Sequence, residues 1–92
     1  MTVNTKQVSV DGTETQLVSS KSLRVRLRIE NTGSGTVYVG EEQVGGNAVT
    51  AGEGYPVKPN EVLRLDDHTG EVNAITGGST ETVKVLEQEA EA

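Results

Sequence analysis

The chain has 92 residues, of which 33% are hydrophobic; two are Tyr and none is Cys, Trp or Phe. This composition predicts one small aliphatic core and excludes disulfides and thiolate metal sites. The formal net charge of −6 argues against general nucleic-acid binding, which needs a basic surface. No apolar run reaches the ~20 residues of a membrane helix, and MTVNTKQVSV lacks the apolar run of a signal peptide. We therefore expect a soluble protein made in the cytoplasm.

Short segments rich in β-branched residues alternate with clusters of Gly, Asn, Asp and Pro, a pattern that predicts strands separated by turns. In chain order, the predicted strands are residues 7–10, 15–19, 22–30, 37–39, 47–51, 61–65, 72–75 and 81–86. The strand at 37–39 is expected to return antiparallel to the strand at 22–30 as a hairpin. Strand and turn signals recur about every 8–12 residues, which predicts an all-β fold, a small antiparallel β-sandwich or barrel of about seven to nine short strands.

Residues 1–87 are expected to form a single β domain, in which residues 1–6 are a candidate loose arm. The stretch LEQEAEA near the C-terminus favours helix, but it is polar all round, and so short a helix is unstable alone. Residues 88–92 are therefore predicted to be a flexible acidic tail.

Catalytic signatures are missing from the sequence. His68 is the only histidine and stands in DDHTG, a turn composition, so we interpret it as a solvated turn residue. The Gly-rich pieces are not followed by helices, which phosphate loops require. A hard cation could bind the cluster Asp66, Asp67, His68 and Glu71, but its spacing matches no calcium loop and Asp-rich turns are ordinary. We predict no enzyme, no cofactor and no metal site, and leave open an ion near Asp66 and Asp67.

The strand LRVRLRIE raises the main question about surfaces, because alternate residues of a strand point to opposite faces. The apolar set expected in the core is Leu23, Val25, Leu27 and Ile29. The opposite face is expected to carry Arg24, Arg26 and Arg28. Three explanations stay open for these arginines: a solvated face paired with acids, a contact with acidic groups of a subunit or partner, or nucleic-acid binding.

The segment GYPVKP is a second candidate contact. Its two prolines, separated by two residues, stiffen an extended loop and remove two amide donors. Such a loop can present Tyr55 to a partner at low entropy cost, or Tyr55 can cap the small core. The candidate partner-binding residues are therefore Arg24, Arg26, Arg28 and Tyr55.

The order of motifs from about residue 21 to residue 87 is distinctive. Its pieces are Asn31–Gly40 (NTGSGTVYVG), Gly54–Glu61 (GYPVKPNE), Leu65–Asp66, Ala74–Ile75 and Val83–Glu87. In this order the pieces resemble small accessory virion proteins of tailed phages. Two positions depart from that pattern: Asn60 stands where the usual turn has Gly, and Asn73 stands where an aromatic is usual. Asn tolerates positive φ, so the turn is expected to survive, whereas the packing around Asn73 is left open.

The resemblance implies an all-β, oligomeric protein without catalysis. It suggests a capsid decoration (cement) protein on the virion surface, made in the host cytoplasm. This protein would bind the major capsid protein lattice, with a homotrimer favoured and no nucleic acid or membrane as partner. The alternative is a host-recognition module of a head fibre or tail fibre that binds a cell-surface receptor or glycan, and a third interpretation is a non-viral β-sandwich adaptor.

Overall fold

The computed structural model describes residues 2–40 and 54–90, which form eight strands and no helix. The strands are β1 (Thr2–Val10), β2 (Thr15–Val18), β3 (Arg24–Asn31), β4 (Val37–Gly40), β5 (Tyr55–Val57), β6 (Val62–Arg64), β7 (Val72–Ile75) and β8 (Glu81–Glu89). The all-β prediction is confirmed. Within the described ranges, nothing resembles a helix that could cross a membrane.

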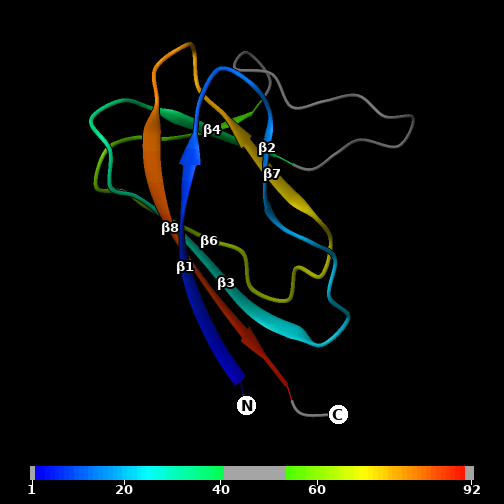
Figure 1. Cartoon of the computed structure of the whole chain (residues 1–92). Helices are drawn as coiled ribbons and strands as arrows, with labels where there is room; N and C mark the ends of the chain where they lie inside the picture. The colour runs from blue at the N-terminus through cyan, green and yellow to red at the C-terminus, as the bar shows by residue number, and fades with distance from the viewer. Residues whose placement is uncertain (1, 41–53, 91–92) are drawn as a thin grey trace.

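The strands form two four-stranded antiparallel sheets that pack as a sandwich (Figure 1). Sheet A has the order β1-β8-β3-β6, and sheet B has the order β2-β7-β4-β5. Eight strands distributed in this way over two sheets are the arrangement of a jelly roll. The predicted hairpin between the third and fourth strands is wrong, because β3 lies in sheet A and β4 in sheet B. The connection after β3 therefore crosses from one sheet to the other.

The core lies between the two sheets and consists of aliphatic side chains from both. Its buried members are Val10, Leu17, Val18, Leu27, Ile29, Val37, Val39, Val57, Val72, Ala74, Val83 and Val85. Neither Tyr belongs to this core, which agrees with the prediction of a small aliphatic core from the composition. The predicted strands at 15–19, 37–39, 61–65 and 72–75 match observed strands to within one residue at each end, because their apolar residues alternate toward this core.

Strand β3 departs from simple alternation at its start. Its register against β8 shifts between Arg24 and Arg26, and the extra residue, Val25, reverses which face the preceding side chain occupies. Arg24 therefore turns inward and is buried, while Val25 is half-buried and Leu23 is 42% exposed. The predicted inward positions of Leu27 and Ile29 are confirmed, and those of Leu23 and Val25 are wrong.

The two ends of the described chain pair with each other. β1 and β8 form nine antiparallel residue pairs, from Thr2 opposite Glu89 to Val10 opposite Glu81. Residues 2–6 are therefore strand and not a loose arm, and Gln88 and Glu89 belong to β8 and not to a flexible tail. The side chains at these ends are mostly polar, so the order comes from backbone hydrogen bonds, which side-chain patterns do not reveal.

Two details of the middle of the chain complete the fold. Tyr55–Val57, predicted as loop, is the short edge strand β5 and pairs with β4; Pro56 is tolerated there because an edge strand has one unpaired side. Asn60 adopts φ 67°, which confirms the expected turn. The predicted strand at 47–51 lies outside the described residues.

Candidate functional site

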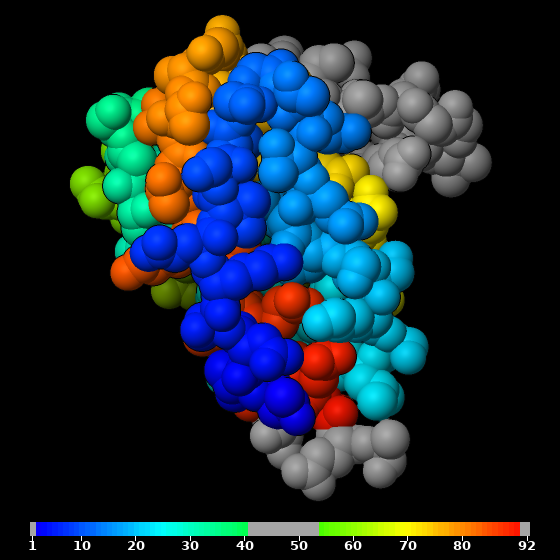
Figure 2. Space-filling view, in the orientation of Figure 1, coloured from blue at the N-terminus to red at the C-terminus, as the bar shows by residue number. Residues whose placement is uncertain are grey.

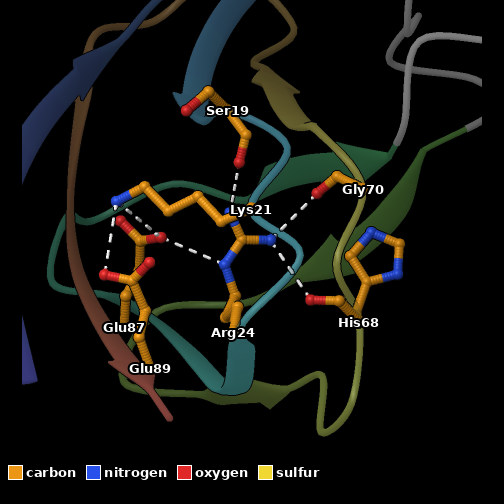
Figure 3. A network of polar contacts seen from close by, with 7 residues as sticks. All are labelled: Ser19, Lys21, Arg24, His68, Gly70, Glu87 and Glu89. Carbon is orange, nitrogen blue, oxygen red and sulfur yellow. Dashed lines mark hydrogen bonds and ion pairs between the residues drawn. The ribbon is translucent and has the colours of Figure 1, made fainter. Parts of the chain in front are cut away.

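The side chain of Arg24 is at the centre of a buried network and is fully enclosed (Figure 3). Its Nε donates to Glu87 Oε2 at 3.0 Å. Its Nη1 donates to the carbonyl oxygens of His68 at 3.2 Å and Gly70 at 3.0 Å, and its Nη2 donates to the carbonyl oxygen of Ser19. One guanidinium thus ties β8 to the two loops that follow β2 and β6.

Lysine and glutamate side chains extend this network toward solvent. Lys21 Nζ lies 3.5 Å from Glu87 Oε2 and 3.9 Å from Glu89 Oε2 (Figure 3). Because its side chain is fully enclosed and makes four hydrogen bonds inside the protein, Arg24 is not accessible to a partner. The expectation that Arg24 shares an exposed face with the other two arginines is wrong, and its role here is structural.

The outer face of sheet A, which points away from the core, does gather positive charge. Arg26 and Arg28 are two residues apart on β3 and share this face, Arg64 on β6 stands directly opposite Arg28, and Lys84 on β8 stands opposite Glu30. We call Arg26, Arg28, Arg64 and Lys84 the cationic face. The sequence missed Arg64 and Lys84, because only strand pairing brings β6 and β8 beside β3.

The carboxyl group of Asp66 lies against this face and pairs with one of its arginines. Arg28 Nη1 donates to Asp66 Oδ1 at 2.5 Å. That hydrogen bond, and then the positive charges of Arg28, Arg26 and Arg64, hold the pKa of Asp66 below its usual value, although partial burial opposes them. The positive charges of this face therefore favour the ionised form of the carboxylate beside them, an effect that salt weakens at an exposed site.

An open groove crosses the cationic face and touches all four strands of sheet A. Its apolar lining residues are Val62, Val85 and Leu86. Its charged lining residues are Lys6, Arg28, Glu30 and Lys84. Thr5 lines its β1 side. The groove therefore offers apolar contact flanked by positive charge, a combination that suits a protein partner.

Tyr55 lies round the edge of sheet A from this groove. It is 63% exposed, so it does not cap the core. A smaller pocket lined by Tyr55, Pro56 and Leu63 also includes Val62, which lines the groove as well. Val62 thus lines both the groove that holds Arg28 and the pocket that holds Tyr55. Arg26 shares the outer face of sheet A with Arg28 but lines neither hollow.

The NTGSGT motif forms a cradle around a buried carboxylate. Glu81 is 5% exposed, and its carboxylate accepts hydrogen bonds from the Ser34 amide at 2.9 Å and from Ser79 Oγ at 2.7 Å. A Cβ added to Gly33 or Gly35 would come within 2.3 Å or 2.5 Å of this carboxylate. Hydrogen bonds from Ser79 and then from the backbone of Gly35 and Ser34 lower the pKa of Glu81. The glycines therefore serve packing.

The acidic turn considered for a cation is divided among other partners. Asp66 binds Arg28, and the Glu71 carboxylate accepts hydrogen bonds from Gln16 and Asn73. No group of three or more metal-ligating side chains comes together in residues 2–40 and 54–90.

Comparisons with known proteins bear on the fold. No family model matches the chain, and no curated protein matches it. A solved structure of a Bacillus endospore appendage, from a novel family of disulfide-linked pili, aligns with 98% of this chain and 90% of that chain, at a TM-score of 0.50 and 15% sequence identity. At this identity the similarity supports the all-β fold alone.

Proposed function

We propose that this chain is a non-catalytic structural protein of a virus particle, a capsid decoration protein that binds the assembled head lattice. The observation that carries the proposal is the cationic face with its apolar groove, in a chain whose net charge is −6. Such a face selects an acidic partner surface, while the remaining acidic surface discourages nonspecific association. The resemblance of the motif order to accessory virion proteins supports the choice of partner.

The mechanism is mass action. A protein that binds the assembled lattice but not its free subunits lowers the free energy of the lattice, and so opposes its expansion or disassembly. Many copies on one particle add their contributions, so each contact need not be strong. This role requires no catalytic group, cofactor or metal.

The groove favours a protein surface over nucleic acid. Glu30 lines the groove together with Arg28 and Lys84. Its carboxylate would repel a phosphate backbone but can accept a hydrogen bond from a protein donor. Nonspecific nucleic-acid binding depends on Lys and Arg side chains that neutralise phosphates, and an acidic residue among them weakens it. If nuclease treatment abolished binding of this chain to the particle, and the chain also bound naked DNA, the partner would be nucleic acid instead.

The pilus structure supports a structural role for a fold of this kind, but its mode of linkage does not transfer. Those pili are described as disulfide-linked, and this sequence contains no cysteine. Assembly of this chain is therefore proposed to be non-covalent, as a homo-oligomer. The trimer expected from the resemblance stays a prediction.

Co-sedimentation with empty capsids tests the docking face. Arg64→Gln removes one exposed charge from the cationic face, and Lys58→Gln is the matched control, because it removes one exposed charge from a loop outside that face. We expect Arg64→Gln to weaken binding and Lys58→Gln to leave it unchanged, with parent binding falling as salt rises. Equal effects of the two variants would contradict the assigned face.

Antibody labelling of virions distinguishes the proposal from its alternative. Even labelling over the head agrees with decoration. Labelling confined to a tail tip or to head fibres would instead indicate a host-recognition module, and absence of label from purified virions would overturn the viral assignment.

A further inference from the structure

Each sheet of the sandwich has two edge strands, whose outward backbone groups have no strand partner in the described structure. They are β1 and β6 in sheet A and β2 and β5 in sheet B. An edge of this kind can accept a strand from another chain, so proteins usually protect edges by short length, proline, bulges or charge.

Three of these four edges are protected. β6 has only three residues. β5 also has three residues, of which Pro56 is one. β2 has four residues, and its pairing with β7 is irregular between Gln16 and Val18. None of the three offers a regular edge long enough to hold a second chain.

β1 is different in each of these respects. It is nine residues long, contains no proline and pairs with β8 without any register shift. Its residues 2–7 are all exposed, so both faces of this half of the strand are open to solvent, and Figure 2 shows this segment, in dark blue, at the surface. Its single charge is Lys6. By the usual rules it is an open site for strand addition.

We infer that two copies of this chain pair antiparallel through β1, about a two-fold axis. β1 is the only edge strand in the described residues with more than four residues, so the one long edge in a second copy that could match it is β1 itself. A contact of a patch with its own copy is the ordinary geometry of a dimer. β1 also carries no carboxylate, so two acidic chains meet here without opposing acids.

The charge of Lys6 disfavours the register in which all nine residues of β1 would pair. If the axis passed through Lys6, Lys6 would face the partner subunit's Lys6. Like charges directly opposite each other in a sheet are unfavourable. If the axis passes through Thr5, Thr5 faces the partner subunit's Thr5 and Lys6 faces the partner subunit's Asn4. Residues 2–8 are then paired, with a favourable Thr–Thr pair at the centre.

This pairing would join the two A sheets into one continuous sheet. Residues opposite each other in a sheet point to the same side, and Thr5 lines the groove on the outer face. The cationic faces of both copies would therefore lie side by side on one surface, which would raise avidity for a repeating lattice. The inference itself does not depend on the proposed function, because the pairing needs only this chain.

Analytical ultracentrifugation of the purified chain tests the pairing without capsids. Thr5→Glu and Thr5→Lys each place like charges across the axis, and both substitutions sit opposite the uncharged Leu86 within the subunit. We expect each variant alone to dimerise about three- to tenfold more weakly than the parent. An equimolar mixture should recover parent dimerisation, because opposite charges then meet. Ser9→Glu is the control, since it lies on the same face of β1 but beyond the paired residues 2–8.

Recovery in the mixture, with Ser9→Glu like the parent, would establish the two-fold pairing at Thr5. A parent that remains monomeric up to about 1 mM would overturn the inference, and so would dimerisation unaffected by the Thr5 variants. Thermal melting of each variant at low concentration separates loss of pairing from loss of folding. A negative result for dimerisation would not contradict capsid binding by the cationic face, because co-sedimentation with capsids measures that binding separately.

Discussion

Among single residues, Arg24 has a structural role, because its buried side chain contacts three segments of the chain. A buried guanidinium is tolerated only when its donors and its charge are satisfied, and Arg24 satisfies them with Glu87 and three carbonyl oxygens. These acceptors belong to β8 and to two loops, so one side chain holds three segments together. An ammonium group could not reach all of these acceptors from one position, because it lacks the planar fork of arginine.

Arg24→Gln should therefore lower the free energy of unfolding by about 3 kcal/mol, because it leaves the buried Glu87 carboxylate with less compensation. Arg24→Lys should recover only a minor part of this loss. Urea denaturation followed by circular dichroism measures both. The control is Arg26→Gln on the exposed face, where we expect a change below about 0.5 kcal/mol. Similar midpoints for Arg24→Gln and Arg26→Gln would show that the bulge does not turn Arg24 inward.

Glu81 makes stability depend on pH in the acidic range. Its pKa in the folded protein is lowered from the ordinary 4.5, so the unfolded chain takes up a proton first as pH falls. The contribution of its charge is complete above about pH 4.5 and is lost as pH falls through the folded pKa. The stability difference between the parent and Glu81→Gln should thus shrink from pH 7 to about pH 3, measured by urea titration at each pH. A difference independent of pH would contradict this account.

At the scale of an element, the loop after β3 depends on two glycines for space and not for φ. A Cβ on Gly33 would lie 2.3 Å from Glu81 Oε1 and 3.0 Å from Glu81 Cβ, and the carboxylate cannot move away without losing its hydrogen bonds. Asn31 fixes the same loop: its Nδ2 donates to the carbonyl oxygens of Gly35 at 2.7 Å and Val57 at 2.8 Å. The NTGSG sequence thus encodes a packed crossing between the two sheets.

Gly33→Ala should cost about 1–3 kcal/mol of unfolding free energy, the usual range for overpacking. Gly77→Ala is the matched control, because a Cβ there would meet nothing within 4 Å. Thermal melting of the two variants compares them directly. If both melt like the parent, the cradle around Glu81 is looser than this structure indicates.

For the molecule as a whole, β8 is the strand that connects the ends of the chain to the rest. It lies between β1 and β3 and pairs with both. Its last residues, Gln88 and Glu89, hold Thr2 and Val3 on one side and Arg24 and Arg26 on the other. The first half of β1 has no other strand neighbour among the described residues, so its order depends on β8.

Deletion of residues 88–92 should therefore destabilise the protein by about 2 kcal/mol through several lost backbone hydrogen bonds, and should increase hydrogen exchange at Thr2 and Val3. Deletion of residues 91–92 alone leaves every described strand intact and should change neither quantity. Unchanged exchange in the longer deletion would instead favour the prediction that residues 88–92 are a flexible acidic tail.

The sequence by itself determined the fold class, several strands and the left-handed turn at Asn60, because alternation, β-branched residues and turn formers are local signals. It also placed Arg26 and Arg28 on an exposed face. The tertiary structure decided the rest. Pairing between distant strands added Arg64 and Lys84 to that face. A one-residue bulge against β8 turned Arg24 inward, and no residue pattern within β3 predicts that bulge. Strands β1 and β8 extend to the ends of the described chain because backbone hydrogen bonding between them compensates for polar side chains, and that partnership is set only when residues about 80 positions apart meet.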